Sequence, residues 1–148
     1  MTVLRTTTLL LALAGIVSLA SASFGHAMDA TPHLYEGEKL KAATMPANGN
    51  LDLSGWTKDG RALVYTLPVK AGQSYEIKFD ASSKFAYLVI FDLSDPEEEA
   101  IFGSDTDGRM AKLKAKTDTT WLIRPYFARN APRRGLGAHF EVKVKAVK

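Results

Sequence analysis

Apolar and polar residues alternate with a period of two in several short runs of this chain. This period puts every second side chain on one face of an extended chain, so each run predicts a β-strand with one buried face. The nearly continuous apolar run Phe85–Phe91 predicts a strand buried on both faces. The stretch Glu36–Thr44 fits either one helical turn or an extended lead-in. The alternating apolar positions are Leu63, Tyr65, Leu67 and Val69; Tyr75, Ile77 and Phe79; Ala111, Leu113 and Ala115; and Phe140, Val142, Val144 and Ala146, and a further strand opens at Trp121-Leu122-Ile123.

Short turns rich in Gly, Asp and Ser separate these runs, as expected between the strands of a β-sandwich. We therefore predict an all-β fold, a single-domain, antiparallel and jelly-roll-like β-sandwich. Lysines on the outward faces of the predicted strands, such as Lys112 and Lys143, would also keep exposed strand edges from pairing with other chains.

Composition excludes several classes of protein. The chain has no cysteine, which excludes disulfide scaffolds, iron–sulfur clusters, thiolate zinc sites and cysteine nucleophiles. Its formal charge of +3 and isoelectric point near 9.1 are modest compared with those of proteins that coat nucleic acid, so we expect no nucleic-acid partner.

The first 27 residues have the pattern of a secretory signal peptide. Arg5 is followed by the apolar run Leu9–Ala20 and by small residues that predict cleavage after Ala22 or Ala27. The run is shorter than the ~20 residues that a membrane-spanning helix needs, and no lipid-accepting cysteine follows it. We expect residues 1–27 to be removed, residues 28–148 to form the sandwich, and the protein to be periplasmic and not membrane-spanning.

The charges are distributed unevenly. Between Asp92 and Asp107 there are seven acidic residues and no basic one, whereas eleven basic and two acidic residues lie between Arg109 and Lys148. Asp92, Asp95, Asp105 and Asp107 offer oxygen ligands for calcium, but the spacing of a calcium-binding loop is missing, and a solvated acidic loop is the interpretation we favour. The basic third of the chain suggests an electrostatic partner surface.

No catalytic motif is present: the chain has no G-x-S-x-G, no H-E-x-x-H and no phosphate-binding loop. Its three histidines, His26, His33 and His139, are scattered and do not suggest a catalytic triad. We predict that the protein is not an enzyme and that it has no cofactor and no metal.

The connection Phe127–Ala138 is longer than a hairpin needs and carries most of the candidate binding residues. Guanidinium groups match carboxylates or phosphates with two parallel hydrogen bonds, and Asn tolerates a left-handed turn. Two interpretations stay open, one in which these arginines bind a partner and one in which they solubilise the loop or pair with the acidic stretch. The candidate residues are Arg124, Arg129, Asn130, Arg133 and Arg134.

The segments Asp52–Gly55, Val64–Leu67, Ala71–Ile77, Tyr87–Phe91 and Trp121–Arg124 resemble those of the bacterial pre-peptidase C-terminal type of β-sandwich. Within that group, Arg124–Arg134 resembles the basic loop of the periplasmic inhibitors of g-type lysozyme, and the likeness spans Leu51 to Val147. The resemblance implies an exported inhibitor that sets Arg129 and Arg133 into the lysozyme cleft against the catalytic acid, with Asn130 supporting the loop. It also implies that Arg124 matches a family arginine that either contacts the partner or only braces its strand.

One family feature is replaced in this chain. The family also uses a tyrosine in the loop before the Val64–Tyr65 strand, where this sequence has Gly60 or Arg61, and the nearest aromatic residue is Trp56. The alternative function is a periplasmic binding module for anionic envelope glycan, peptidoglycan or lipid phosphate, that uses the same loop with Trp56 or Tyr126 as a stacking face. A purely structural envelope protein is a third hypothesis.

Overall fold

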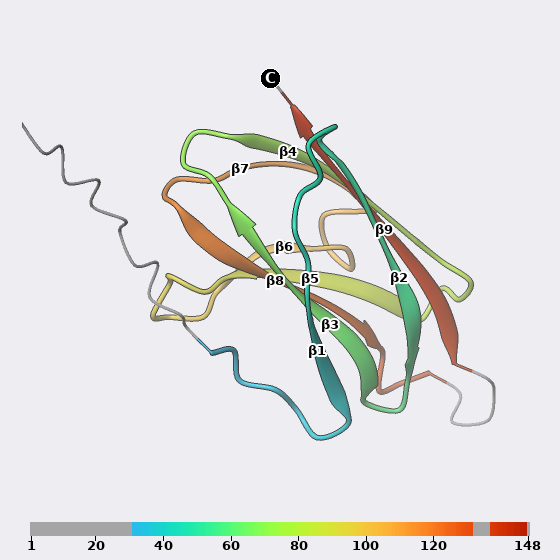
Figure 1. The fold of residues 1–148 in the computed structure, drawn as a ribbon. Helices are drawn as coiled ribbons and strands as arrows, with labels where there is room; N and C mark the ends of the chain where they lie inside the picture. Colours follow the sequence, from blue (N-terminus) through green and yellow to red (C-terminus); the bar gives the residue numbers. More distant parts are fainter. Residues whose placement is uncertain (1–30, 132–136, 148) are drawn as a thin grey trace, which may run out of the picture.

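The computed structural model describes residues 31–131 and 137–147. Within these residues the secondary-structure elements are all β-strands (Figure 1). The predicted signal peptide, residues 1–27, lies outside the described residues. No helix long and apolar enough to cross a membrane occurs within the described ranges. The strands are β1 (Glu38–Ala42), β2 (Asn50–Lys58), β3 (Arg61–Val69), β4 (Ser74–Ala81), β5 (Ala86–Asp92), β6 (Ala100–Gly103), β7 (Met110–Lys114), β8 (Thr119–Phe127) and β9 (Ala138–Val147).

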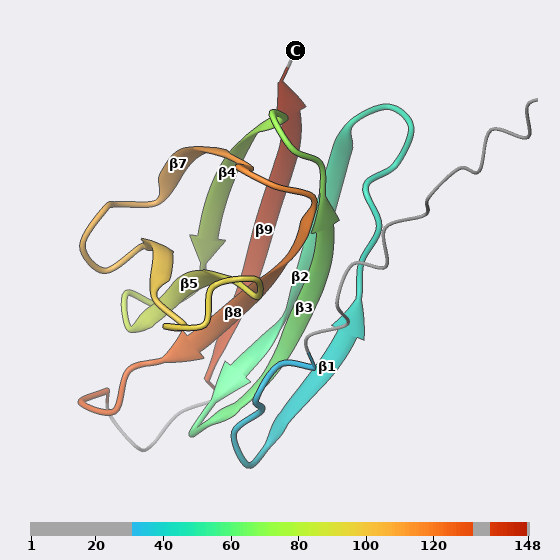
Figure 2. The ribbon, with the colours of Figure 1, turned by 90° about the vertical axis from the view of Figure 1, so that its left-hand side faces the viewer.

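The sheet folds into two layers because β3 changes partners along its length. Ala62 pairs with β2 on one edge and with β1 on the other, whereas Tyr65 pairs with β8 and still with β1. β2 and β8 therefore share one edge of β3. One layer has the strand order β1-β3-β8-β5-β6 and the other has the order β2-β9-β4-β7 (Figures 1 and 2).

The predicted all-β, single-domain sandwich is confirmed, with one departure from antiparallel pairing. β1 runs parallel to β3, with Leu40 opposite Val64. The other strand pairs are antiparallel. Of the two interpretations of Glu36–Thr44, the extended one is correct.

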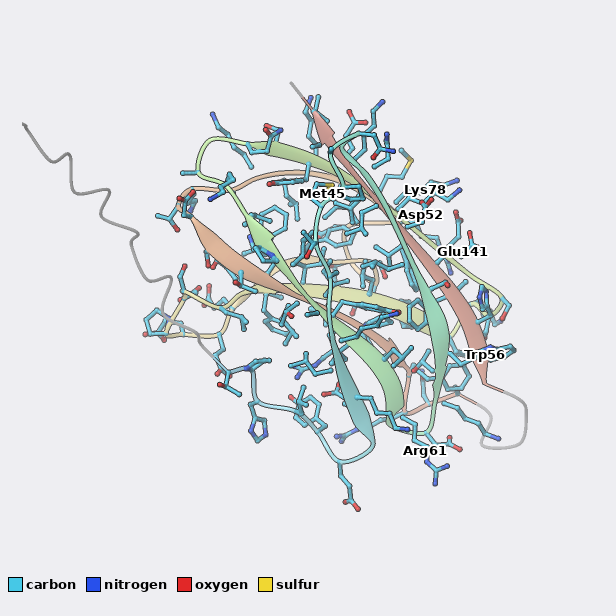
Figure 3. The ribbon with its side chains drawn as sticks, viewed as in Figure 1. Met45, Asp52, Trp56, Arg61, Lys78 and Glu141 are labelled. Atoms are coloured by element: carbon cyan, nitrogen blue, oxygen red, sulfur yellow. The ribbon has the colours of Figure 1, made fainter. Side chains whose placement is uncertain are left out.

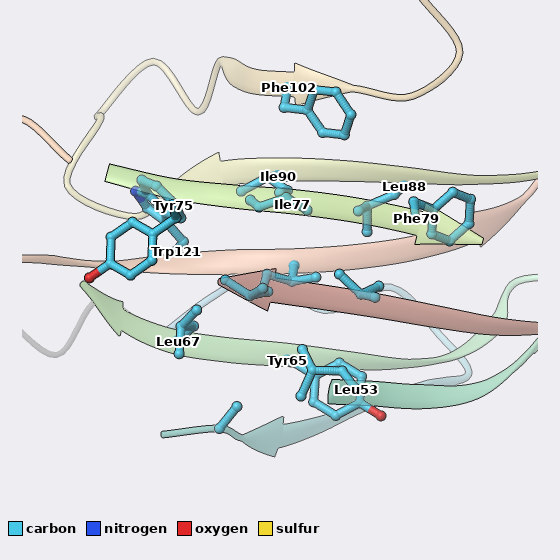
Figure 4. Close-up of a cluster of buried hydrophobic side chains, with 14 of the residues drawn as sticks. Leu53, Tyr65, Leu67, Tyr75, Ile77, Phe79, Leu88, Ile90, Phe102 and Trp121 are labelled. Carbon is cyan, nitrogen blue, oxygen red and sulfur yellow. The ribbon is translucent and has the colours of Figure 1, made fainter. Parts of the chain in front are cut away.

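The core lies between the two layers and is filled by the alternating apolar positions (Figure 4). Trp121 of β8 packs edge-on against Tyr75 of β4, with ring centroids 5.2 Å apart, and so links the two layers. Because alternate residues of each strand point inward, the sequence pattern and the packing agree. The largest fully buried side chains include Leu67, Ile77, Phe79, Leu88, Ile90 and Phe140.

β5 is less buried than its apolar run predicts. Ala86, Leu88 and Ile90 are fully buried, but Tyr87, Val89 and Phe91 on the opposite face are half-buried. The prediction of a strand buried on both faces is therefore wrong for this outer face. It is wrong because the second layer packs on the inward face of β5, where Ala86, Leu88 and Ile90 lie in the core.

The acidic connection from Asp92 to Gly108 is not one continuous loop. It contains β6, which pairs with β5 across Val89 and Gly103. The turn between β2 and β3 was also absent from the predicted strand pattern. Its two central residues, Asp59 and Gly60, have positive φ of 50° and 79°, as a tight two-residue hairpin requires.

The outer face of the β2-β9-β4-β7 layer carries charges of both signs. Lys143 lies opposite Asp52 on β2, and Lys145 lies opposite Glu76 on β4. Figure 3 shows Asp52, Lys78 and Glu141 on this face. The outward lysines are thus distributed among carboxylates across neighbouring strands, as on a solvated sheet surface.

Candidate functional site

The candidate binding loop begins at an exposed turn after β8. The amide of Ala128 donates to Phe85 O at 2.8 Å, and the amide of Ala131 donates to Ala128 O at 3.0 Å, which closes the turn. Arg129 and Asn130 occupy the tip and are exposed. The structure therefore presents two of the predicted residues to solvent on a hydrogen-bonded base.

Arg133 and Arg134 lie outside the described residues, so their predicted role stays a prediction. The described chain resumes at Gly137, which has φ of 81° and lies against β2. A Cβ at this position would come within 2.6 Å of Thr57 O. A glycine is therefore required where the loop rejoins the sandwich.

Arg124 is placed differently from Arg129. Its side chain is only 10% exposed, and its Nε lies 3.0 Å from Glu38 Oε1, a carboxylate that is 6% exposed. Its Nη2 donates to His33 O and to Glu38 Oε2, the latter at 3.2 Å. These contacts hold the N-terminal segment against β8.

Two aromatic rings flank the Arg124 guanidinium. Its carbon lies 4.6 Å from the centroid of Tyr35 and 5.6 Å from that of Phe91. A planar cation between rings is favourable in a partly dry environment. Arg124 thus fixes Tyr35, a residue of the N-terminal segment, over the outer face of the β1-β3-β8-β5-β6 layer.

The segment Tyr35–Glu38 forms a tight turn around this buried ion pair. The amide of Tyr35 donates to Glu38 Oε2 at 2.9 Å, and the amide of Glu38 donates to Tyr35 O at 3.0 Å. Gly37, with φ of 92°, lies against the β2–β3 turn, where its ideal Cβ would be 3.3 Å from Gly60 O. The N-terminal turn and the β2–β3 hairpin therefore meet side by side.

A groove of about 1010 Å³ opens between the N-terminal turn, the β2–β3 hairpin and the Arg129 turn, and we call it the outer groove. Arg124, Tyr126 and Arg129 all line it, so the fold brings together three residues that were singled out in the sequence. It also contains residues that were missed. Prominent among these are Tyr35, Glu36, Asp59, Val89 and Phe91.

Tyr126 is the aromatic candidate that reaches the outer groove. Burial raises its pKa, and the charge of Asp105 and a hydrogen bond to that carboxylate raise the pKa further, to about 12. Tyr126 is therefore a neutral donor at ordinary pH. Its ring lies 5.6 Å from that of Tyr87 on the neighbouring strand.

Trp56 lies elsewhere. It is 56% exposed on β2, 5.7 Å from the ring of His139, and is not among the residues that line the outer groove (Figure 3). Gly60 itself lines the groove, and Arg61 follows it at the start of β3. Trp56, the aromatic residue nearest to Gly60 in the sequence, is therefore not part of the groove that Gly60 lines, whereas Tyr35 is.

The acidic stretch has a structural role at its first residue. Asp92 Oδ1 accepts hydrogen bonds from the Ser94 amide at 3.0 Å, from Ser94 Oγ at 2.7 Å and from Thr119 Oγ1 at 2.7 Å. Burial alone would raise the pKa of Asp92, but these bonds outweigh it and hold the pKa below its ordinary value.

In the described stretches, no group of three or more His, Asp or Glu residues is arranged to hold a metal ion. The ion pairs of the same residues join Lys70 to Asp118, Lys78 to Asp80 and Arg124 to Glu38. Within those residues, Arg129 is not paired with the acidic stretch.

No protein-family model matches the chain, and no curated protein matches it. Solved structures do match. The periplasmic inhibitor of g-type lysozyme from Aeromonas hydrophila, PliG, is similar with a TM-score of 0.60 and 25% identity, over 74% of this chain and 99% of that one.

Two further structures resemble the fold. The pre-peptidase C-terminal domain of a Bacillus anthracis collagenase has a TM-score of 0.55 and 20% identity, over 73% of this chain and 96% of that one. A mutant of Escherichia coli PliG has a TM-score of 0.49 and 15% identity, over 75% and 99% of the two chains. The predicted resemblance to both groups is confirmed at the level of structural neighbours.

Proposed function

We propose that the protein is an exported, non-enzymatic inhibitor of g-type lysozyme that acts in the periplasm. The observation that carries this proposal is the structural match to A. hydrophila PliG across 99% of that inhibitor. The position of Arg129 and Asn130 on an exposed, hydrogen-bonded turn after β8 supports it, because an inserting element must protrude and keep its shape.

The proposed mechanism needs no chemistry by the inhibitor. A glycosidase uses a carboxylic acid that must donate a proton to the leaving oxygen of its substrate. The guanidinium groups of Arg129 and Arg133 would enter the cleft and pair with that carboxyl group in its ionised form. The substrate is then excluded, and the carboxylate has no proton to donate. Asn130 supports the turn, Arg134 extends the basic surface, and Arg124 acts indirectly by bracing β8.

The test is a cell-wall lysis assay in which the protein is titrated against a g-type and a c-type lysozyme in parallel. We expect stoichiometric inhibition of the g-type enzyme alone. Arg129→Ala and Arg133→Ala should each lose about 2–5 kcal/mol of binding free energy, since truncation leaves a desolvated carboxylate unpaired. That loss corresponds to at least about 30-fold weaker inhibition.

Two variants make the assay specific. Arg109→Ala is the matched control, because Arg109 packs on Phe79 and does not line the outer groove. Arg129→Lys keeps the charge but loses the planar fork, so it should inhibit poorly if two parallel hydrogen bonds are made. Full inhibition by both alanine variants, or no inhibition of the g-type enzyme by the natural protein, would reject the proposal. In the second case, binding to intact peptidoglycan would test the alternative function.

A further inference from the structure

The outer groove combines aromatic rings with charged side chains. Tyr35, Phe91 and Tyr126 line it, and so do the exposed side chains of Glu36 and Asp59. Its volume of about 1010 Å³ lies at the upper end of the range of small-ligand sites, roughly 300–1,000 Å³. Aromatic surface together with a few polar groups is the usual composition of a site that binds a small molecule.

Tyr35 is a rigid and exposed part of this site. It is 60% exposed, although its amide and carbonyl are both hydrogen-bonded to Glu38 and the Arg124 guanidinium lies 4.6 Å from its ring centroid. A ring that is already held in place loses little conformational entropy when a ligand stacks on it. The contacts with Glu38 and Arg124 thus order the Tyr35 ring before any ligand binds.

The charges around the groove favour a neutral, hydroxyl-rich ligand. Arg124 and Glu38 neutralise each other, so among the described residues that line the groove Glu36, Asp59 and Arg129 set the remaining charge. The carboxylates of Glu36 and Asp59 disfavour an anion. A hydroxyl group, by contrast, can donate to Asp59 or Glu36 and accept from Arg129. Such bonds are charge-assisted and therefore comparatively strong.

We propose that the outer groove is a binding site for a short neutral saccharide. A pyranose ring stacks by its apolar face on the exposed ring of Tyr35, and its hydroxyl groups bond to Asp59 and Arg129. This function goes beyond lysozyme inhibition and does not depend on it, although Arg129 belongs to both surfaces. A long apolar ligand is disfavoured, because it would desolvate the rim charges without bonding to them.

The test is a titration of the isotopically labelled full-length protein with chitotriose, followed by NMR in the absence of any lysozyme. We expect amide shifts at the outer groove and a millimolar to submillimolar affinity. Tyr35→Ala should weaken binding by about tenfold through loss of the stacked ring, whereas Tyr35→Phe should retain it. Asp59→Asn should weaken binding severalfold, and Asn tolerates the positive φ of this turn, so the hairpin is preserved.

Trp56→Ala is the matched control. Trp56 is as exposed as Tyr35 but lies outside the groove, so its variant should bind chitotriose like the natural protein. The proposal is overturned if no shifts appear, if they cluster away from the groove, or if Tyr35→Ala binds unchanged. Since no lysozyme is present, none of these outcomes affects the inhibitor proposal, which fails only in the lysis assay.

Discussion

At the scale of single residues, Thr57 is the polar group that the described structure explains least. The residue is 1% exposed, and its hydroxyl has no hydrogen-bond partner among residues 31–131 and 137–147. A buried hydroxyl without a partner loses its bonds to water and gains none in return. We expect Thr57→Val, which keeps the β-branched shape, to raise the free energy of unfolding by about 1 kcal/mol in urea denaturation.

Thr119 offers the matched control for this prediction. It is also a buried threonine on a strand, but its hydroxyl donates to Asp92 at 2.7 Å. Thr119→Val should therefore lower the free energy of unfolding, because it leaves a carboxylate oxygen short of a donor. A loss of stability in both variants would contradict the interpretation that the Thr57 hydroxyl is unpaired.

At the scale of elements, the Arg124–Glu38 pair joins the N-terminal turn and β1 to β8. Both side chains are at least 90% buried, so removing one partner leaves a charge without compensation. Arg124→Met should lower the free energy of unfolding by about 3–5 kcal/mol. The double variant Arg124→Met with Glu38→Leu should recover much of this loss, because no buried charge is left behind.

A double-mutant cycle in urea denaturation measures this coupling. Additive effects of Arg124→Met and Glu38→Leu would show that the two charges do not depend on each other, contrary to the contact between them. The same Arg124→Met variant also separates bracing from partner contact. If Arg124 only braces its strand, the inhibition by Arg124→Met should fall only in proportion to the fraction of this variant that is unfolded.

Asp92 connects the end of β5 to the start of β8 and makes this connection sensitive to acid. Its pKa is lower in the folded protein than the usual value of about 3.9 that it has when unfolded. A lowered pKa means that the carboxylate stabilises the fold above about pH 4, and that this contribution is lost as the pH falls through the folded-state pKa. The natural protein should therefore lose its stability advantage over Asp92→Asn on acidification, as measured by urea denaturation from neutral to strongly acidic pH. A constant difference across that range would contradict this role.

At the scale of the whole molecule, the sequence predicts the sandwich well because alternation reports which face of each strand is buried. For β1 it leaves a helical turn and an extended segment open, because Glu38–Ala42 is an edge strand whose side chains are mostly exposed, and its place is set by pairing with β3. It fails for β6 because four residues within an acidic stretch carry no clear period. Tertiary pairing, and not local pattern, determines both.

The candidate site is predictable only in part for a related reason. Arg129 and Asn130 lie in one loop, so the spacing of residues along the chain is enough to suggest them. The outer groove is assembled from Tyr35, Asp59 and Tyr126, which come from three segments far apart in the sequence. The Asp59-Gly60 pair was a readable hairpin signal, but only the folded chain shows that Tyr35 lies beside it.

The distribution of charge over the whole molecule leads to a prediction about salt. The lysines of the β2-β9-β4-β7 layer lie among carboxylates, whereas Arg129 protrudes at the end of the sandwich without an ion-pair partner in the described parts of the chain. If the loop carries the electrostatic contact, inhibition of g-type lysozyme should weaken as the salt concentration rises, since exposed charges are screened beyond about 10 Å at 0.1 M and about 3 Å at 1 M.

Lys143→Ala should leave both the inhibition and its salt dependence unchanged, with a stability effect within about 0.5 kcal/mol. Arg129→Ala should flatten the salt dependence. An equal change in slope for the two variants would mean that the general positive charge of the molecule, and not the loop, attracts the enzyme.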